Sequence, residues 1–155
     1  MDALIEALDT LAAERLDGAF GPALLERLGP LLTAANRLAA EVARTVRQCE
    51  LTGAAEHDGL KTMVGWLRGH GHLAETEAAR LVATGRALEH LPAVAAGFAE
   101  GMITAGQVGL IARIAEPERR SAAADRDIDL TAIDEALKLA AATQPFDTLK
   151  QAVGR

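Results

Sequence analysis

The sequence predicts an all-α fold, a compact domain of about seven to nine helices. Half of its 155 residues are hydrophobic, and only three Phe, one Trp and no Tyr are present. Alanine and leucine make up most of the apolar residues, and both favour helices, whereas aromatic and β-branched residues favour strands. We expect one domain over 1–155, with N-terminal helices in 1–56, a central part in 57–115 and C-terminal helices in 116–155.

The first segment, residues 2–16, has the spacing of an amphipathic helix, with Leu4, Leu8 and Leu11 on one side. Residues 18–22 break this pattern, and Gly29-Pro30 interrupts the next one, because proline fits the start of a helix better than its interior. The sequence therefore predicts a short helix followed by a longer one that begins at Leu31.

The longer helix carries a stripe at alternating steps of four and three residues. The stripe consists of Leu31, Ala35, Leu38, Val42, Thr45 and Cys49, thickened by Val46. Such a heptad-like pattern is typical of a helix that faces the core, and also of one that pairs with a partner helix. Both interpretations remain open at this point.

Residues 57–73 predict the next helix, with Asp58 as its N-cap, Trp66 as a core anchor, and glycines at its end. Its apolar face is Leu60, Met63, Val64 and Leu67. A further helix is expected from Glu75 to His90, with Arg80 and Arg86 pointing outward. Pro92 then begins a short helix that closes at Gly101.

Residues 71–78 and 101–108, thirty residues apart, share a sequence pattern. Each begins with Gly and any residue, continues with Leu or Ile, a small residue and two residues of any type, and ends with Glu or Gln and a small apolar residue. Thr104 and Gln107 in the second have capping-box spacing, whereas Ala74 in the first has no hydroxyl. Both octapeptides predict helix-turn-helix-like glycine turns, which also occur where helices merely pack.

The C-terminal part begins with a charged stretch, 116–129, that predicts a short helix and a loop. Helical spacing returns in 131–142, where Asp134 and Glu135 fall in the favourable first turn. Pro145 begins the last predicted helix.

A net charge of −6 argues against a surface that grips nucleic acid over its whole extent. Residues 58–90 nevertheless carry four basic and four acidic side chains, against five and nine in residues 1–57. The candidates for phosphate contact are the basic residues of this neutral stretch, Lys61, Arg68, Arg80 and Arg86. Ordinary surface basic residues are the alternative.

Catalytic patterns are missing from the sequence. Ser121 is the only serine and lacks a Gly-x-Ser-x-Gly frame, and no phosphate-binding loop is present. Cys49, His57, His70 and His72 fall within a short stretch, but without a Cys-x-x-Cys pair, so a metal-dependent enzyme is a minor alternative. We expect no catalytic residues, no metal and no cofactor.

The single cysteine and the lack of a signal peptide or apolar span predict a cytoplasmic chain that enters no membrane.

Residues 57–115 resemble the central part of the actinobacterial domain of unknown function 222, also called the 13E12 repeat family. The resemblance rests on Trp66-Leu67, residues 77–82, Leu91-Pro92, residues 101–104 and Gln107-Val108. It implies a helical module that precedes a His-Asn-His (HNH) nuclease module in mycobacterial and related proteins, some of them of phage or mobile-element origin. Asn36 is the only asparagine and no His-Asn-His motif exists, so the resemblance implies no catalytic residue here.

We therefore expect a non-enzymatic, DNA-associated module whose chain is truncated before a nuclease module. It would position DNA or that nuclease. The alternative is a protein-interaction or homo-oligomerisation module without nucleic-acid binding, which the stripe from Leu31 to Cys49 favours.

Overall fold

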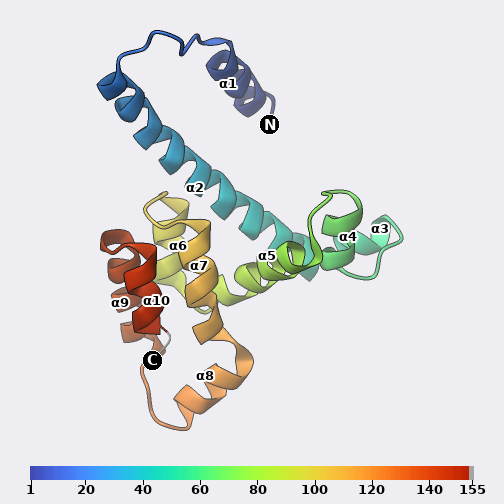
Figure 1. Ribbon diagram of the computed structural model, residues 1–155. Helices are drawn as coiled ribbons and strands as arrows, with labels where there is room; N and C mark the ends of the chain where they lie inside the picture. The colour runs from blue at the N-terminus through green and yellow to red at the C-terminus, as the bar shows by residue number, and fades with distance from the viewer. Residues whose placement is uncertain (154–155) are drawn as a thin grey trace. The chain divides into compact units, whose positions relative to one another are not determined.

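The computed structural model describes residues 1–153 and confirms the all-α prediction. The described residues form ten α-helices and one 3₁₀ helix, nine of the α-helices having seven or more residues, and no strand (Figure 1). The chain divides into two units, Met1–Leu32 and Thr33–Arg155, with the boundary inside one helix. Each unit is described by itself.

The first unit contains α1 (Asp2–Ala13) and the beginning of α2 (Gly21–Leu51). Arg27 ties the two together, because its Nη2 donates to the Leu11 carbonyl at 3.3 Å and its Nη1 pairs with Glu14. No residue of Met1–Leu32 is buried.

The predicted interruption at Gly29-Pro30 is wrong, since α2 continues through Pro30 without a break. A proline inside a helix removes one hydrogen bond and leaves the carbonyl four residues earlier without its helical donor. Pro30 and Glu26 are both exposed, so water can reach that carbonyl. Leucine and alanine on both sides favour the helix strongly enough to continue it.

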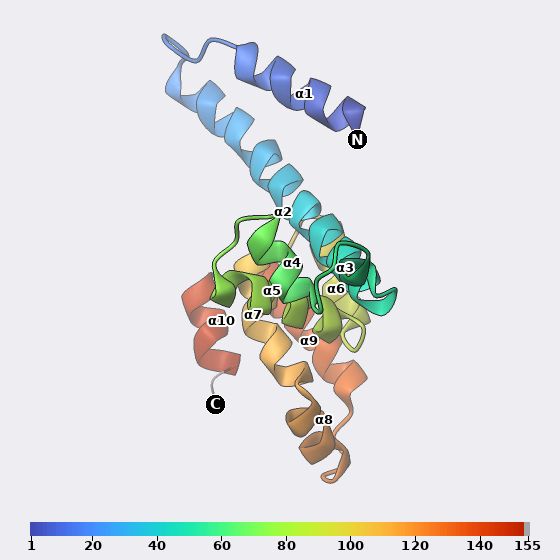
Figure 2. The same ribbon diagram turned by 90° about the vertical axis from the view of Figure 1, so that its right-hand side faces the viewer.

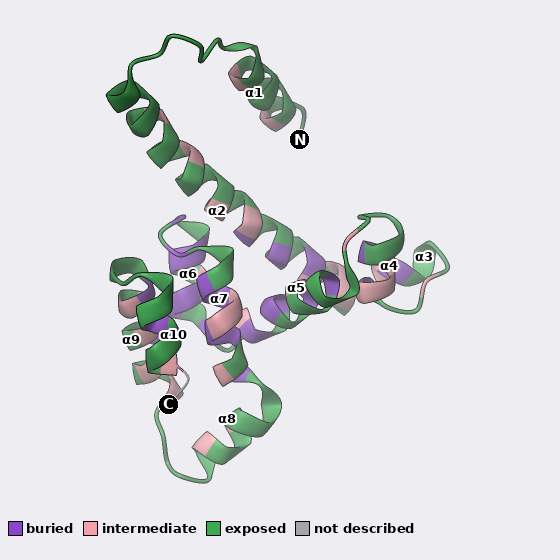
Figure 3. Ribbon diagram, in the orientation of Figure 1, coloured by how far each residue is buried: buried purple, intermediate pink, exposed green. Residues whose placement is uncertain are grey.

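The second unit contains the rest of α2 and all later elements. They are α3 (Ala54–His57), α4 (Met63–Gly69), α5 (Glu75–Leu88), α6 (Pro92–Ala99), α7 (Ala105–Ile111), the 3₁₀ helix η1 (Ala112–Ala115), α8 (Pro117–Ala124), α9 (Leu130–Thr143) and α10 (Phe146–Val153). Helix α9 packs against α6, and α10 against α7 (Figure 1, Figure 2). Buried residues concentrate in α5, α6 and α7 (Figure 3).

Of the stripe that the sequence predicts, helix α2 buries only Val46. Its buried residues are Ala40, Ala43 and Val46, whereas Leu38 and Val42 of the stripe are each 42% exposed. The interpretation of this stripe as the core-facing side is therefore wrong for Leu38 and Val42 and holds only at its C-terminal end, where Val46 is buried and Cys49 half-buried. Alanines face the core here because the backbone of α5 comes close: a Cβ on Gly85 would lie 3.0 Å from the Ala43 carbonyl oxygen.

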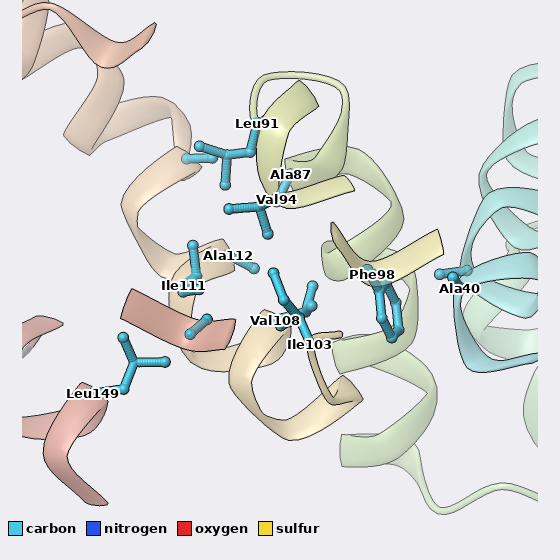
Figure 4. Close-up of a cluster of buried hydrophobic side chains, with 13 residues drawn as sticks. Ala40, Ala87, Leu91, Val94, Phe98, Ile103, Val108, Ile111, Ala112 and Leu149 are labelled. Carbon is cyan, nitrogen blue, oxygen red and sulfur yellow. The ribbon is translucent and has the colours of Figure 1, made fainter. Parts of the chain in front are cut away.

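The larger of two hydrophobic clusters joins side chains of α2, α5, α6, α7, η1, α9 and α10. Phe98, Ile103, Ile111 and Leu149 are among its most deeply buried members (Figure 4). Burial of one such side chain stabilises the fold by about 1.5–3 kcal/mol. This cluster holds the C-terminal helices on the rest of the unit.

The smaller cluster consists of Val46, Ala55, Met63, Leu67, Ala78 and Val82, and joins the end of α2 to α3, α4 and α5. Trp66 only borders it, half-buried, so the prediction of a core anchor is wrong. Its indole Nε1 donates to Asp58 at 2.6 Å and its ring stacks on His70. Asp58 is therefore not the N-cap of α4; Thr62 is, because its hydroxyl accepts from the Gly65 amide.

Each predicted glycine turn joins two helices, α4 to α5 and α6 to α7. The capping box of the second turn is confirmed: the Thr104 amide donates to Gln107 Oε1 at 3.0 Å, and the Gln107 amide donates to Thr104 Oγ1 at 3.2 Å. Ala74, at the equivalent place in the first turn, makes no side-chain cap. Gly101 has a φ of 82°, the left-handed region that glycine tolerates best.

Asp134 lies in α9 but serves another helix. It is 1% exposed, and its carboxylate accepts from the backbone amides of Ala93 at 2.6 Å and Val94 at 3.0 Å in the first turn of α6. The orphan amides of that helix start are thus satisfied from a distant segment. Gln107 acts similarly, donating to the Ala141 carbonyl at 2.8 Å.

Candidate functional site

All four basic residues that the sequence singles out are exposed, but their partners differ. Arg68 Nη1 lies 3.6 Å from Glu75, and Arg86 donates through Nε to Glu50 at 3.0 Å. Lys61 and Arg80 have no carboxylate within ion-pair distance among residues 1–153. Half of the predicted set is therefore already neutralised within the protein.

The structure brings three of these four residues together. Arg80 and Arg86 line one hollow of about 800 Å³, which we call the arginine hollow. Lys61 and Arg86 line a second hollow of about 410 Å³, and Glu50 borders both. Arg68 lines neither hollow, which removes it from the candidate site.

A network of ion pairs that the sequence does not reveal lines the arginine hollow. Arg47, on α2, donates to Glu89 through two nitrogens at 2.9 and 2.8 Å and to Glu50 at 2.6 Å. Glu50 also accepts from Arg86. Two arginines are thus matched by two carboxylates, which fixes α2 against α5.

The network shifts the titration of both carboxyl groups. The hydrogen bond from Arg86, followed by that from Arg47, lowers the pKa of Glu50 against the opposing effect of burial. The hydrogen bond from Arg47 likewise lowers the pKa of Glu89. Both side chains therefore stay ionised at neutral pH, and Arg86 is held by Glu50.

Further arginines line the hollow from η1 and α8, outside the stretch 58–90 that contains the predicted candidates. Arg113 and Arg120 both line it, and neither has a carboxylate within ion-pair distance among residues 1–153. The Nη1 of Arg120 lies 3.0 Å from Nδ1 of His90. A guanidinium group only donates, so Nδ1 of His90 is the acceptor and its Nε2 carries the proton.

Arg120 also contains the one buried side-chain nitrogen or oxygen atom without a hydrogen-bond partner in the described part of the chain, its Nε. Such an atom is uncommon in a folded protein, because a buried donor left unpaired costs about 1–3 kcal/mol. Arg120 therefore lines the hollow from a partly buried position.

The balance of charge in the arginine hollow is positive. Five arginines and three glutamates line it: Arg47, Arg80, Arg86, Arg113 and Arg120, with Glu50, Glu89 and Glu116. Arg80, Arg113 and Arg120 are the three without a carboxylate partner. Guanidinium groups bind and orient anions, above all phosphate oxygens, through paired N–H donors.

Other chemistry finds less support in the arrangement. Among residues 1–153, no three His, Cys, Asp or Glu side chains are gathered so that they could hold a metal ion. The residues of the minor zinc hypothesis are separated: Cys49 borders the second hollow, whereas His70 stacks on Trp66. No described helix has the length and apolar character that crossing a bilayer requires.

An apolar hollow of about 450 Å³ lies along the exposed stripe of α2. Leu38 and Val42 form one side, and Leu73, Leu81 and Phe98 contribute to the others. This is where the predicted stripe remains accessible in the second unit.

Comparison with known proteins gives a family but no function. No curated protein matches the chain, and no solved structure matches it. A family model, Domain of unknown function (DUF222), matches residues 25–147, which include both glycine turns and every residue that lines the arginine hollow. The chain therefore belongs to the DUF222 family.

Proposed function

We propose that this chain is a non-catalytic, DNA-associated helical module that contacts nucleic-acid phosphates through the arginine hollow and its rim. The observation that carries the proposal is the gathering of Arg80, Arg113 and Arg120, which have no carboxylate partner in the described chain, around one hollow. Lys61, which lines the neighbouring hollow with Glu50, Glu56 and Arg86, adds one further cation without a carboxylate partner among residues 1–153. Contacts to phosphates position a protein on nucleic acid without reading its sequence.

The resemblance to the 13E12 repeat proteins extends this proposal to the biological setting. In this proposal the module acts in the cytoplasm of an actinobacterium. It belongs to a protein related to HNH endonucleases, and it positions DNA or the nuclease module. Arg113 and Arg120 then join Arg80 and Lys61 as phosphate contacts. Arg86 takes the role of a positioning residue, because its guanidinium is held by Glu50.

A salt titration tests the proposal. Fluorescence anisotropy with a short labelled duplex at about 50 and about 200 mM salt should show binding that weakens steeply, since each phosphate contact releases about 0.9 counterion. The double variant R80A/R113A should reduce the slope of log K against log salt by about 2. R44A is the matched control, because Arg44 is exposed, pairs with Glu41 and lies outside the arginine hollow.

Two results would contradict this proposal. Absence of binding at about 50 mM salt removes the nucleic-acid role altogether. Binding with an unchanged slope in R80A/R113A moves the contact away from the arginine hollow.

The apolar hollow favours a second candidate function, protein interaction or homo-oligomerisation through α2. Two large aliphatic side chains, Leu38 and Val42, remain 42% exposed on one helix face. Contiguous exposed apolar surface of this kind is typical of interaction sites. Light scattering over a concentration series tests it: L38D should reduce self-association if the stripe pairs with a partner helix, and a monomer at every concentration counts against pairing between copies.

A further inference from the structure

We propose that the arginine hollow is a site for a phosphate monoester, and that its ligand in the nucleic-acid setting is the terminal phosphate at a strand end. The assignment of the ligand to a DNA strand end rests on the proposed function, whereas the monoester site itself does not. Three features of the hollow support a monoester site: its arginines without carboxylate partners, its concave shape and its positive charge.

The donors come from three different elements that pack on one another. Arg80 lies on α5, Arg113 on η1 and Arg120 on α8, and η1 packs against both α5 and α8. The stem of Arg80 lies beside Gly109 of α7, where a Cβ would be 3.6 Å from the Arg80 Cδ. Arginines that converge from a folded scaffold can bind one anion together, because the scaffold has already ordered them.

Arg120 is the deepest of these donors. It is half-buried, and its Nε is shielded from solvent without accepting partners. Arg119, the preceding residue of the same helix, is exposed and does not line the hollow. Because Arg120 is half-buried, an anion that binds beside it is less screened by water and salt than one that binds an exposed arginine.

The shape and charge favour a monoester over a phosphodiester. A duplex presents its diesters on a convex surface, each with one negative charge, so the exposed arginines Arg80 and Arg113 can contact them, whereas the half-buried Arg120 is less accessible to them. A monoester carries about −1.5 to −2 charges at neutral pH and three acceptor oxygens, and it stands at the end of a chain where it can enter a concave site. A hollow of about 800 Å³ also has room for the attached nucleoside.

The walls fit such a nucleoside. Small and apolar residues alternate with the arginines around the hollow, among them Ala83, Ala87, Ala112 and Pro117. His90 supplies one further polar group, and with Nδ1 occupied by Arg120 its Nε2–H is a donor. The glutamates of the hollow, Glu50, Glu89 and Glu116, oppose an anion, and Arg47 and Arg86 offset the first two.

The test compares ligands that differ only in the terminal phosphate. Anisotropy is measured with a duplex carrying 5′-phosphates and with the same duplex carrying 5′-hydroxyls, and calorimetry with thymidine 5′-monophosphate and with thymidine. We expect the phosphorylated member of each pair to bind at least about tenfold more tightly, the effect of charge-assisted hydrogen bonds to one phosphate.

The variants R120A and R119A form the matched pair. Both variants remove one positive charge from adjacent positions of α8. A difference in affinity between them therefore reports the contact that Arg120 makes in the hollow and not the change in net charge. R120A should abolish the preference for the phosphate, R119A should leave it within about twofold, and R120K should restore only part of it, since lysine lacks the paired donors. Circular dichroism and a thermal melt confirm that each variant is folded.

The outcomes separate this inference from the proposed function. Preference for phosphorylated duplex, lost in R120A alone, supports both. Binding of thymidine monophosphate that depends on Arg120, without binding of either duplex, supports the monoester site and refutes the nucleic-acid role. Equal binding of both duplexes together with no binding of the mononucleotide overturns the monoester site and leaves DNA association standing.

Discussion

Replacement of Asp134 by alanine is expected to destabilise the second unit more than any exposed helix cap does. Asp134 is buried in α9 and accepts two hydrogen bonds, from the amides of Ala93 and Val94 at the start of α6. Among residues 1–153 it has no cation within ion-pair distance, so its partners are these backbone groups. Loss of the carboxylate leaves both amides unsatisfied in a buried place.

The magnitude follows from those two amides. Each buried donor without a partner costs about 1–3 kcal/mol, and removal of the buried carboxylate returns part of that as relief of its desolvation. We therefore expect D134A to lower the free energy of unfolding by about 3 kcal/mol. D134N, which keeps one acceptor oxygen, should cost roughly half as much.

Urea denaturation of the full chain, followed by far-ultraviolet circular dichroism, measures this loss. A change of about 3 kcal/mol shifts the midpoint by about 1.5 M if the slope is about 2 kcal/mol per molar. The matched control is D129A, because Asp129 caps the start of α9 from an exposed position and accepts from the Thr131 amide at 2.8 Å. That variant should cost about 1 kcal/mol. A D134A variant no less stable than D129A would refute the reasoning.

Two further predictions concern backbone and charge. G101A should be clearly less stable than G59A: both glycines have positive φ, but a Cβ on Gly101 would lie 2.7 Å from the Thr33 carbonyl oxygen, whereas the space around Gly59 is open. Equal thermal midpoints would contradict this. Glu50 has a folded pKa below its ordinary value of 4.5, so its contribution to stability is present above that pH and is lost as the pH falls through the folded pKa. E50Q should therefore flatten the acid side of a stability profile, and a profile parallel to wild type would count against the network.

Helices α5 and α9 were predictable because their spacing is a local property of the chain, whereas the helix predicted over 57–73 is wrong in its bounds, since only Met63–Gly69 forms α4. The second glycine turn is another local feature: the pattern of Thr104 and Gln107 determines the capping box without help from distant residues. The continuation of α2 through Pro30 could not be predicted in this way. It depends on whether the freed carbonyl meets water, and exposure is a tertiary property.

The candidate site was only partly predictable for the same reason. Arg80 and Arg86 were found because they lie in the stretch 58–90, where basic and acidic residues balance, but Arg113 and Arg120 lie outside that stretch. Which arginines are free depends on the pairing of Arg47 and Arg86 with Glu50 and Glu89, residues up to 42 positions apart. Counting charges along the sequence cannot identify those pairs.

Helix α5 connects the two hydrophobic clusters. Ala87 belongs to the larger one and Val82 to the smaller one, and Leu81 packs against both. Neither cluster can lose this helix without exposing part of the other, so the second unit should open as one cooperative event, with the amides of α5 exchanging slowest with solvent. Arg80 and Arg86 stand on that same helix. Their backbone positions are therefore set before any anion arrives, and only the ordering of the side chains remains to oppose binding.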